Sequence, residues 1–259
     1  MALISVDQDA RGVATLRLAR AEKHNALSAD MLSELEDAAR ALAADRTVRV
    51  VVLAAEGPTF CAGGDLAWMK AQFAMDRATR RRESARIAEA LGALYALPQP
   101  LIARVHGNAF GGGVGVISVC DMVIGADAAR FALTETKLGL IPANIGPYVA
   151  ARLGAVAAAE VFMNARVFDA SDAVRLGLLN RAVSPDALDD AVAAEVTPYL
   201  SCAPGAVRDA KALLRRLSGA VDPAAVEAAI DALADRWETD EAQAGIQAFF
   251  DKTPAPWAQ

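Results

Sequence analysis

The stretch from Leu101 to Val119 constrains the fold of this chain most. Leu101–Val105 is an apolar run, which predicts a buried strand. A short loop follows, and then Gly111, Gly112 and Gly113 open a predicted helix that continues to Val119. The first N–H groups of a helix have no partner within it and lie at the positive end of its dipole. This turn therefore offers donors to an anion, either a bound phosphate or an oxyanion that develops during a reaction.

The glycine spacing argues against two common phosphate-binding motifs. A dinucleotide fingerprint counted from Gly111 and Gly113 needs glycine at position 116, where Val116 stands. A P-loop needs Gly-Lys-Ser or Gly-Lys-Thr, and neither follows here. The sequence therefore favours a developing oxyanion. Close packing of a helix on a strand remains the alternative that the glycines alone leave open.

Composition narrows the class of protein. With 259 residues, 54% hydrophobic and 22% charged, the chain is long and apolar enough for a large globular core. The net charge of −6 argues against nucleic-acid binding. No apolar stretch has the length of a membrane span and no leader-like segment opens the chain, so we expect a cytoplasmic protein. Cys61, Cys120 and Cys202 are too scattered to predict disulfides or a metal site.

Strands with turns come first along the chain and helices follow. The patterns predict a hairpin over 3–7 and 13–18, strands over 48–54, 101–105, 121–126 and 130–133, and helices over 29–44, 66–70, 75–95, 155–164, 170–176, 185–200, 203–217, 223–237 and 240–251. The basic stretch 77–86 is interpreted as a solvated helix face. We expect an α/β core over 1–195 and a helical C-terminal region over 196–259.

Several segments together resemble the crotonase family, the enoyl-CoA hydratase/isomerase superfamily. They are R-A-E-K-H-N-A-L at 20–27, F-C-A-G-G-D-L at 60–66, H-G-N-A-F-G-G-G-V-G at 106–115 and A-R-F-A-L-T-E-T-K-L-G-L-I-P at 129–142. The resemblance implies a spiral of stacked ββα units, a helical C-terminal trimerisation region and an acyl-CoA thioester substrate. It implies a homotrimer or a dimer of trimers, with no cofactor beyond the CoA of the substrate and with neither nucleic acid nor membrane as partner. Leu213, Leu214, Leu217, Ile230 and Leu233 are the apolar residues expected to face neighbouring subunits.

The resemblance also assigns roles to particular residues. The N–H groups of Gly64 and Gly112 match the donors that stabilise the thioester oxyanion, and glycine permits close approach there. The residues that match CoA-contacting positions are Lys23, His24, Ala26, Ala62, Asp65 and Leu66, together with Phe249 and Lys252, which often act from a neighbouring subunit.

The acid–base residues depart from the pattern of the family hydratases, which use two glutamates. Glu135 matches the second glutamate, whereas Gly115 stands at the position of the first. One carboxyl group of suitable pKa can still move a proton at the α carbon. We expect Gly115 to leave space near the β carbon of the substrate, and the water to be held by Asn144, Tyr148 or a carboxylate of the substrate.

Several functions therefore remain open. The segment around Gly115 and that at 140–149 most resemble methylglutaconyl-CoA and isohexenylglutaconyl-CoA hydratase-like members, which act in branched-chain and terpenoid breakdown. The alternatives are a double-bond isomerase that uses Glu135 alone and a catalytically silent acyl-CoA binder. An RNA-binding relative is disfavoured by the acidic charge, and dehalogenase-like chemistry by Asn144 where an aspartate is usual.

Overall fold

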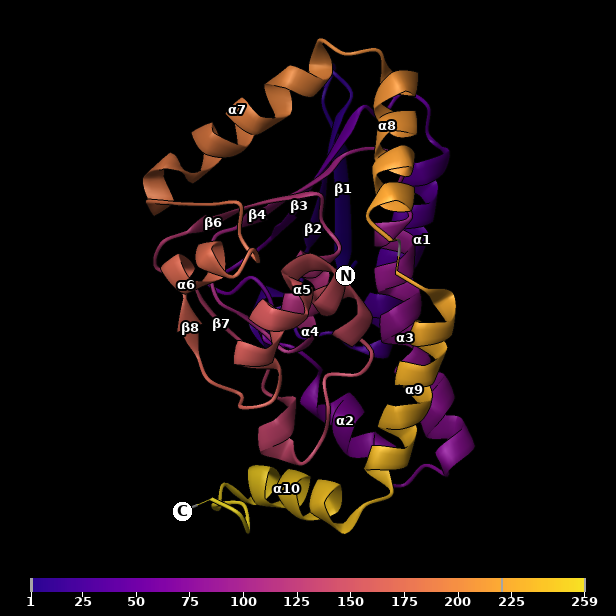
Figure 1. Cartoon of the computed structure of the whole chain (residues 1–259), viewed down its shortest axis with the longest axis vertical. Coiled ribbons are helices and arrows are strands. Elements are labelled where there is room, and N and C mark those ends of the chain that lie inside the picture. The colour runs from indigo at the N-terminus through magenta and orange to yellow at the C-terminus, as the bar shows by residue number, and fades with distance from the viewer. Residues whose placement is uncertain (1, 220, 259) are drawn as a thin grey trace.

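Two sheets form the centre of the computed structural model, which describes residues 2–219 and 221–258 (Figure 1). In spatial order, the larger sheet contains β1 (Ile4–Gln8), β2 (Val13–Leu18), β3 (Val50–Ala55), β4 (Leu101–Val105), β6 (Met122–Ala126) and β9 (Arg181–Val183). Only the β1–β2 hairpin in it is antiparallel. The smaller sheet contains β5 (Ala109–Phe110), β7 (Arg130–Ala132) and β8 (Phe168–Asp169). The predicted α/β class is confirmed.

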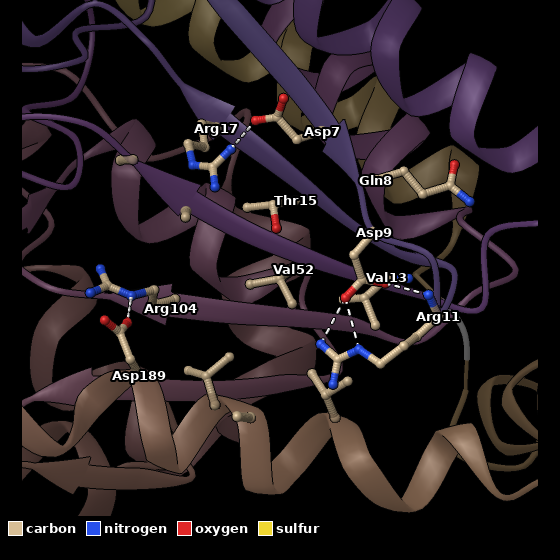
Figure 2. A pocket seen from close by; sticks show the side chains of 15 residues that line it. Asp7, Gln8, Asp9, Arg11, Val13, Thr15, Arg17, Val52, Arg104 and Asp189 are labelled. Atoms are coloured by element: carbon tan, nitrogen blue, oxygen red, sulfur yellow. Dashed lines mark hydrogen bonds and ion pairs between the residues drawn. The ribbon is translucent and has the colours of Figure 1, made fainter.

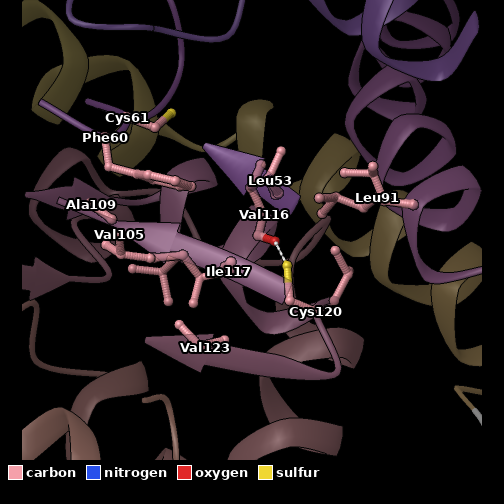
Figure 3. Packing of buried hydrophobic residues seen from close by; sticks show 14 of the residues in the cluster. Leu53, Phe60, Cys61, Leu91, Val105, Ala109, Val116, Ile117, Cys120 and Val123 are labelled. Carbon is pink, nitrogen blue, oxygen red and sulfur yellow. Dashed lines mark hydrogen bonds between the residues drawn. The ribbon is translucent and has the colours of Figure 1, made fainter. Parts of the chain in front are cut away.

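Alternation along the strands divides the core between the two faces of the larger sheet. On β3, Val51 and Leu53 join the main cluster, whereas Val50 and Val52 join a second one. The main cluster lies against α1 (Ala29–Ala44), α3 (Arg77–Tyr95) and α4 (Gly112–Ser118), and Figure 3 shows its centre. The second cluster lies under α7 (Leu188–Leu200). Because both faces are covered, the parallel strands are buried and nearly continuous in apolar residues.

Side-chain caps fix the start of two helices that follow loops. The Ser28 hydroxyl accepts a hydrogen bond from the Met31 N–H at 3.3 Å and begins α1 at the predicted residue. The Asp65 carboxylate accepts one from the Trp68 N–H at 3.0 Å and begins α2 (Leu66–Gln72). The cap at Asp65 places the start of α2 directly after Gly64.

The remaining helices are α5 (Gly146–Phe162), α6 (Ala170–Arg175), α8 (Pro204–Leu217), α9 (Pro223–Trp237) and α10 (Asp240–Asp251). In Figure 1, α8 and α9 run along the side of the molecule that α1 and α3 form, and α10 crosses its end. Among the described residues, no helix is long and apolar enough to cross a membrane.

Ion pairs join α3 to α9. On α3, Arg77 pairs with Asp235 and Arg81 with Asp231 and Glu227, all three on α9. Arg80 pairs with Glu238, the residue that follows α9. The interpretation of the basic stretch as a solvated face is therefore wrong for Arg80, which is buried under an acidic segment far along the chain. Arg77 and Arg81 stay accessible to solvent in their ion pairs. These ion pairs hold the last turns of α9 beside α2 and α3.

Some predictions of strands and helix boundaries are wrong because contacts with distant parts of the chain determine the local structure there. The short strands β5, β8 and β9 are not predicted, since two or three residues carry no periodicity. The helix expected over 155–164 begins at Gly146 and is interrupted at Gly154, whose φ is 72° and ψ is 157°. The expected division after residue 195 lies within α7, which packs on the sheet.

The apolar face expected on the C-terminal helices divides between two environments. Leu213, Leu214 and Leu217 on α8 are exposed at 47%, 65% and 76%. Ile230 and Leu233 on α9 are buried within the same chain, so the expectation that they face neighbours is wrong. The predicted trimer stays a prediction, with α8 as its exposed apolar face.

Candidate active site

A cavity of about 100 Å³ brings together the predicted oxyanion donors and the predicted acid–base residue. Its walls come from α2, α3, the start of α4, the segment 135–145 and α9. The lining residues are Gly64, Trp68, Met69, Gln72, Ser84, Ile87, Gly112, Glu135, Leu140, Ile141, Pro142, Ala143, Asn144, Ile145, Leu233 and Trp237. Glu135 is the only titratable side chain among them.

Gly64 and Gly112 supply two free backbone donors to this cavity. Within the described ranges, neither N–H donates a hydrogen bond to another backbone or side-chain acceptor. A Cβ on Gly112 would lie 2.8 Å from Leu27 Cδ1, whereas a Cβ on Gly64 would meet the Met69 side chain, with Sδ at 3.4 Å and Cγ at 3.6 Å. A side chain at 112 would therefore have to displace the end of the Leu27 side chain, whereas one at 64 would make an ordinary contact.

The turn that contains Gly64 is held on both sides. The Leu27 N–H donates to the Gly63 carbonyl at 2.7 Å, and the Asp65 N–H donates to the Leu27 carbonyl at 3.0 Å. Asp65 also pairs with Arg20 at 2.6 Å. Burial raises the pKa of Asp65, but the Trp68 N–H and the Arg20 guanidinium outweigh it and bring that pKa below its usual value. These contacts hold the Gly64 donor in place before any substrate binds.

Glu135 lies at the start of a short 3-10 helix (Glu135–Leu138) and points into a dry environment. Loss of hydration raises the pKa of its carboxyl group to about 7. Its Oε2 is buried and has no hydrogen-bond partner in the described residues. A carboxyl group with a pKa near neutrality can both accept and return a proton at physiological pH.

The expectation that Gly115 leaves space for the substrate is wrong. Gly115 does not line the cavity, and a Cβ there would lie 2.8 Å from Ile145 Cβ and 3.2 Å from Leu91 Cδ1. Ile145 itself lines the cavity and covers Gly115. The volume that a glutamate could occupy at 115 is therefore filled by an isoleucine.

The two residues proposed to hold water have different surroundings. Tyr148 does not line the cavity; its hydroxyl donates to the Ala88 carbonyl at 3.4 Å, inside the core. Asn144 does line it, is 4% exposed, and donates from Nδ2 to the Ser84 carbonyl at 2.9 Å. Of these two, the structure therefore brings only Asn144 to Glu135.

The residues assigned to CoA lie outside the cavity in two groups. The segments 23–26 and 62–66 run side by side, linked by a hydrogen bond of 2.9 Å from the Ala62 N–H to the His24 carbonyl. This group, which comprises Lys23, His24, Ala26, Ala62, Asp65 and Leu66, adjoins Gly64. Phe249 and Lys252 lie on and after α10 and are not brought to the cavity by this chain. The CoA assignments stay predictions.

The sequence did not predict the wall of the cavity that α2, α3 and α9 form. Trp68, Met69 and Gln72 come from α2, Ser84 from α3, and Leu233 and Trp237 from α9. Trp237 is brought in by the α3–α9 ion pairs, and Arg80 lies over its ring at 5.6 Å. Charge spacing in the sequence could have indicated that α9 packs against α3. Acidic residues recur every four positions on α9, at 227, 231 and 235, and Arg77 and Arg81 have the same spacing on α3.

A larger cavity of about 610 Å³ lies between the outer face of the sheet and α7 (Figure 2). Its charged side chains are paired with one another: Arg11 with Asp9 at 2.7 Å, Arg17 with Asp7 at 2.5 Å and Arg104 with Asp189 at 2.5 Å. None of the unpartnered buried side-chain atoms in the described residues lines it, whereas Glu135 Oε2 and Asn144 Oδ1 both belong to residues of the smaller cavity. The smaller cavity is therefore the candidate for chemistry.

Known proteins are similar to this chain over most of its length. A family model described as enoyl-CoA hydratase/isomerase matches residues 8–259. An enoyl-CoA hydratase of Mycobacterium smegmatis has a crystal structure with a TM-score of 0.81 and 37% identity over 100% of both chains. The enoyl-CoA hydratase structure from Mycobacterium avium gives a TM-score of 0.88 at 31% identity over 99% of both chains. The mitochondrial methylglutaconyl-CoA hydratase of Mus musculus is 34% identical over 188 residues, which are 72% of this chain and 59% of that protein.

Proposed function

Since the chain belongs to the enoyl-CoA hydratase/isomerase family, we propose that it adds water across the C2=C3 double bond of a 2-enoyl-CoA thioester. The observation that carries the proposal is the meeting of two free N–H donors and one raised-pKa carboxyl group in a single cavity. The donors are Gly64 and Gly112, and the carboxyl group is that of Glu135.

The donors act on the thioester oxygen. As water attacks C3, negative charge moves onto the carbonyl oxygen and gives an enolate. Two N–H groups directed at that oxygen stabilise the charge, and loss of one such donor typically costs about 3 kcal/mol of transition-state stabilisation. Because the backbone around Gly64 is held before binding, little reorganisation is needed when the charge develops.

Glu135 moves the proton. Its carboxylate accepts a proton from the attacking water as the C3–O bond forms, and the resulting acid gives that proton to C2. The sum is one water added, with oxygen on C3 and hydrogen on C2, and Glu135 regains its starting state. A pKa of about 7 suits a group that performs both steps.

A glutaconyl-type acyl chain is the finer candidate for the substrate. It is supported by the resemblance in segment 140–149 and by the methylglutaconyl-CoA hydratase relative, of which the chain spans 59%. The described residues that line the cavity include no lysine or arginine, so a second carboxylate would rely on neutral donors such as the Gln72 amide. The volume of about 100 Å³, with Trp68 and Trp237 in its lining, favours a short branched chain over one of terpenoid length.

Double-bond isomerisation is the second candidate reaction. It is favoured by one observation: of the described residues that line the cavity, Glu135 alone has a titratable side chain. A single carboxyl group suffices to take a proton from C2 of a 3-enoyl-CoA and return it to C4, whereas water needs additional contacts to be positioned.

Mass spectrometry in ¹⁸O-labelled water distinguishes these reactions. The protein is incubated with crotonyl-CoA, with 3-methylglutaconyl-CoA and with a 3-enoyl-CoA. We expect product that carries one labelled oxygen from at least one 2-enoyl-CoA. Conversion of the 3-enoyl-CoA alone, at unchanged mass, would make the protein an isomerase, and no conversion of any substrate would favour a silent binder.

A further inference from the structure

Three buried polar side chains form a cluster in the wall of the same cavity. Gln72 is 4% exposed, Ser84 2% and Asn144 4%, and they come from α2, α3 and the segment before α5. Asn144 Nδ2 donates to the Ser84 carbonyl at 2.9 Å, and the Ser84 hydroxyl lies 3.5 Å from Gln72 Oε1. Polar groups buried among Ile87, Leu233 and other apolar side chains are costly unless they have partners.

One atom of this cluster is left without a partner. Asn144 Oδ1 is buried and accepts no hydrogen bond from the described residues. The orientation of the amide is fixed, because rotating it would place Oδ1 against the Ser84 carbonyl, and two acceptors repel each other. Because Asn144 lines the cavity, we infer that a molecule bound in the cavity supplies the donor that this buried acceptor lacks.

Water is the reactant that meets this need. The thioester carbonyl and the C2=C3 double bond of an enoyl-CoA carry no hydrogen-bond donor, whereas the attacking water carries two. Asn144 directly precedes Ile145, the residue that fills the volume above Gly115. The amide thus lies next to the region where a second glutamate is missing.

We propose that Asn144, oriented by the Ser84 carbonyl, is the positioning residue that holds the attacking water through its Oδ1. This proposal rests on the proposed hydration and deepens it. One hydrogen of the water is donated to Asn144 Oδ1 and stays on the oxygen, while the other passes to Glu135 as the oxygen bonds to C3. The amide takes no proton, so Glu135 performs all of the proton transfer.

The test separates water addition from enolate formation. Exchange of the C2 hydrogens of butanoyl-CoA in D₂O needs the oxyanion donors and Glu135 but no water addition. Hydration of crotonyl-CoA needs the oxyanion donors, Glu135 and a positioned water. Asn144→Leu removes the acceptor and fills its space with a side chain of similar shape. Asn144→Ala removes the acceptor and leaves room for an additional water.

We expect Asn144→Leu to lower kcat for hydration at least ~10-fold, the effect of about one hydrogen bond, and to keep C2 exchange within ~3-fold of wild type. Asn144→Ala should lose less hydration than Asn144→Leu, because an additional water can replace the amide oxygen. The control is Ser118→Ala, which removes a buried hydroxyl bonded to the Val114 carbonyl outside the cavity and should change neither rate.

Three outcomes would overturn the proposal. Unchanged hydration in Asn144→Leu would remove Asn144 from water positioning. Equal loss of hydration and exchange would assign it a structural role. Normal crotonyl-CoA hydration with selective loss of 3-methylglutaconyl-CoA turnover would make its Oδ1 a contact of the acyl chain. If the wild type shows neither hydration nor exchange, the proposed function itself fails.

Discussion

Glu135 Oε1 lies 3.1 Å from the point where a Cβ would stand on Gly111. Gly111 directly precedes the donor Gly112 and has a φ of 47° and a ψ of −116°, a backbone conformation that favours glycine. The carboxyl group and the oxyanion donor are therefore positioned by the same turn. A single methyl group at Gly111 would disturb both.

Gly111→Ala should lower kcat for hydration at least ~10-fold by displacing Glu135, with a smaller change in KM, since the segments 23–26 and 62–66, which are predicted to contact CoA, are untouched. Steady-state kinetics with crotonyl-CoA measures this effect. Gly205→Ala is the matched control, because a Cβ there meets no atom within 4 Å. Equal kcat in the two variants would mean that Glu135 does not depend on the Gly111 turn.

Two substitutions at Gly64 isolate the oxyanion donor. Gly64→Ala keeps the N–H and places its Cβ at 3.4 Å from Met69 Sδ, so activity should stay near normal. Gly64→Pro removes the N–H and should lower kcat by ~10²–10³-fold, the usual effect of losing one such donor. Thermal unfolding of both variants checks that the turn is retained. A fully active, folded proline variant would exclude Gly64 as a donor.

The raised pKa of Glu135 predicts a pH-dependent stability. In the folded protein this pKa is about 7, against 4.5 for an ordinary glutamate, so between these pH values the folded state holds a proton that the unfolded chain has lost. The free energy of unfolding should therefore fall by up to about 3 kcal/mol as the pH rises through this range.

Glu135→Gln carries no such proton and serves as the reference for that effect. Urea unfolding at about pH 5 and about pH 8 should show that the advantage of the variant over wild type grows with pH. A constant difference between the two proteins would show that Glu135 titrates normally and is hydrated.

The packing of Ile145 over Gly115 predicts that a second glutamate cannot simply be restored. Gly115→Glu would place its Cβ 2.8 Å from Ile145 Cβ and bury a carboxyl group beside Leu91. We expect it to destabilise the protein by at least ~3 kcal/mol through overpacking and burial of a charge. Chemical denaturation measures the loss, and wild-type stability would contradict the close packing seen here.

The cavity residues that lie in short motifs could be predicted from the sequence. The cavity residues that long-range packing places there could not. Gly64, Gly112 and Glu135, which line one cavity, could be named because they lie in segments with a recognisable order. The cavity wall formed by Leu233 and Trp237 depends on how α9 lies against α3, which no local pattern specifies. The charge spacing on the two helices was present but was compatible with ordinary solvated faces.

At Gly115 the sequence led to a prediction of open space that the structure contradicts. The absence of a side chain predicted open space, but the volume next to a glycine is decided by its neighbours in the fold, and Ile145 fills it. Interiors are close-packed, so a missing side chain is usually replaced by another one. The same packing directs Asn144, which precedes Ile145, into the cavity wall.

The central claim is that Glu135 carries all of the proton transfer in hydration. The most direct measurement is kcat for hydration of crotonyl-CoA, or of the better substrate from the panel, in Glu135→Gln, with Glu89→Gln on the exposed face of α3 as the control. The account predicts a loss of at least ~10²-fold in Glu135→Gln, with unchanged acyl-CoA binding by calorimetry and normal kcat in Glu89→Gln. Hydration by a folded Glu135→Gln at a rate near that of Glu89→Gln would contradict it.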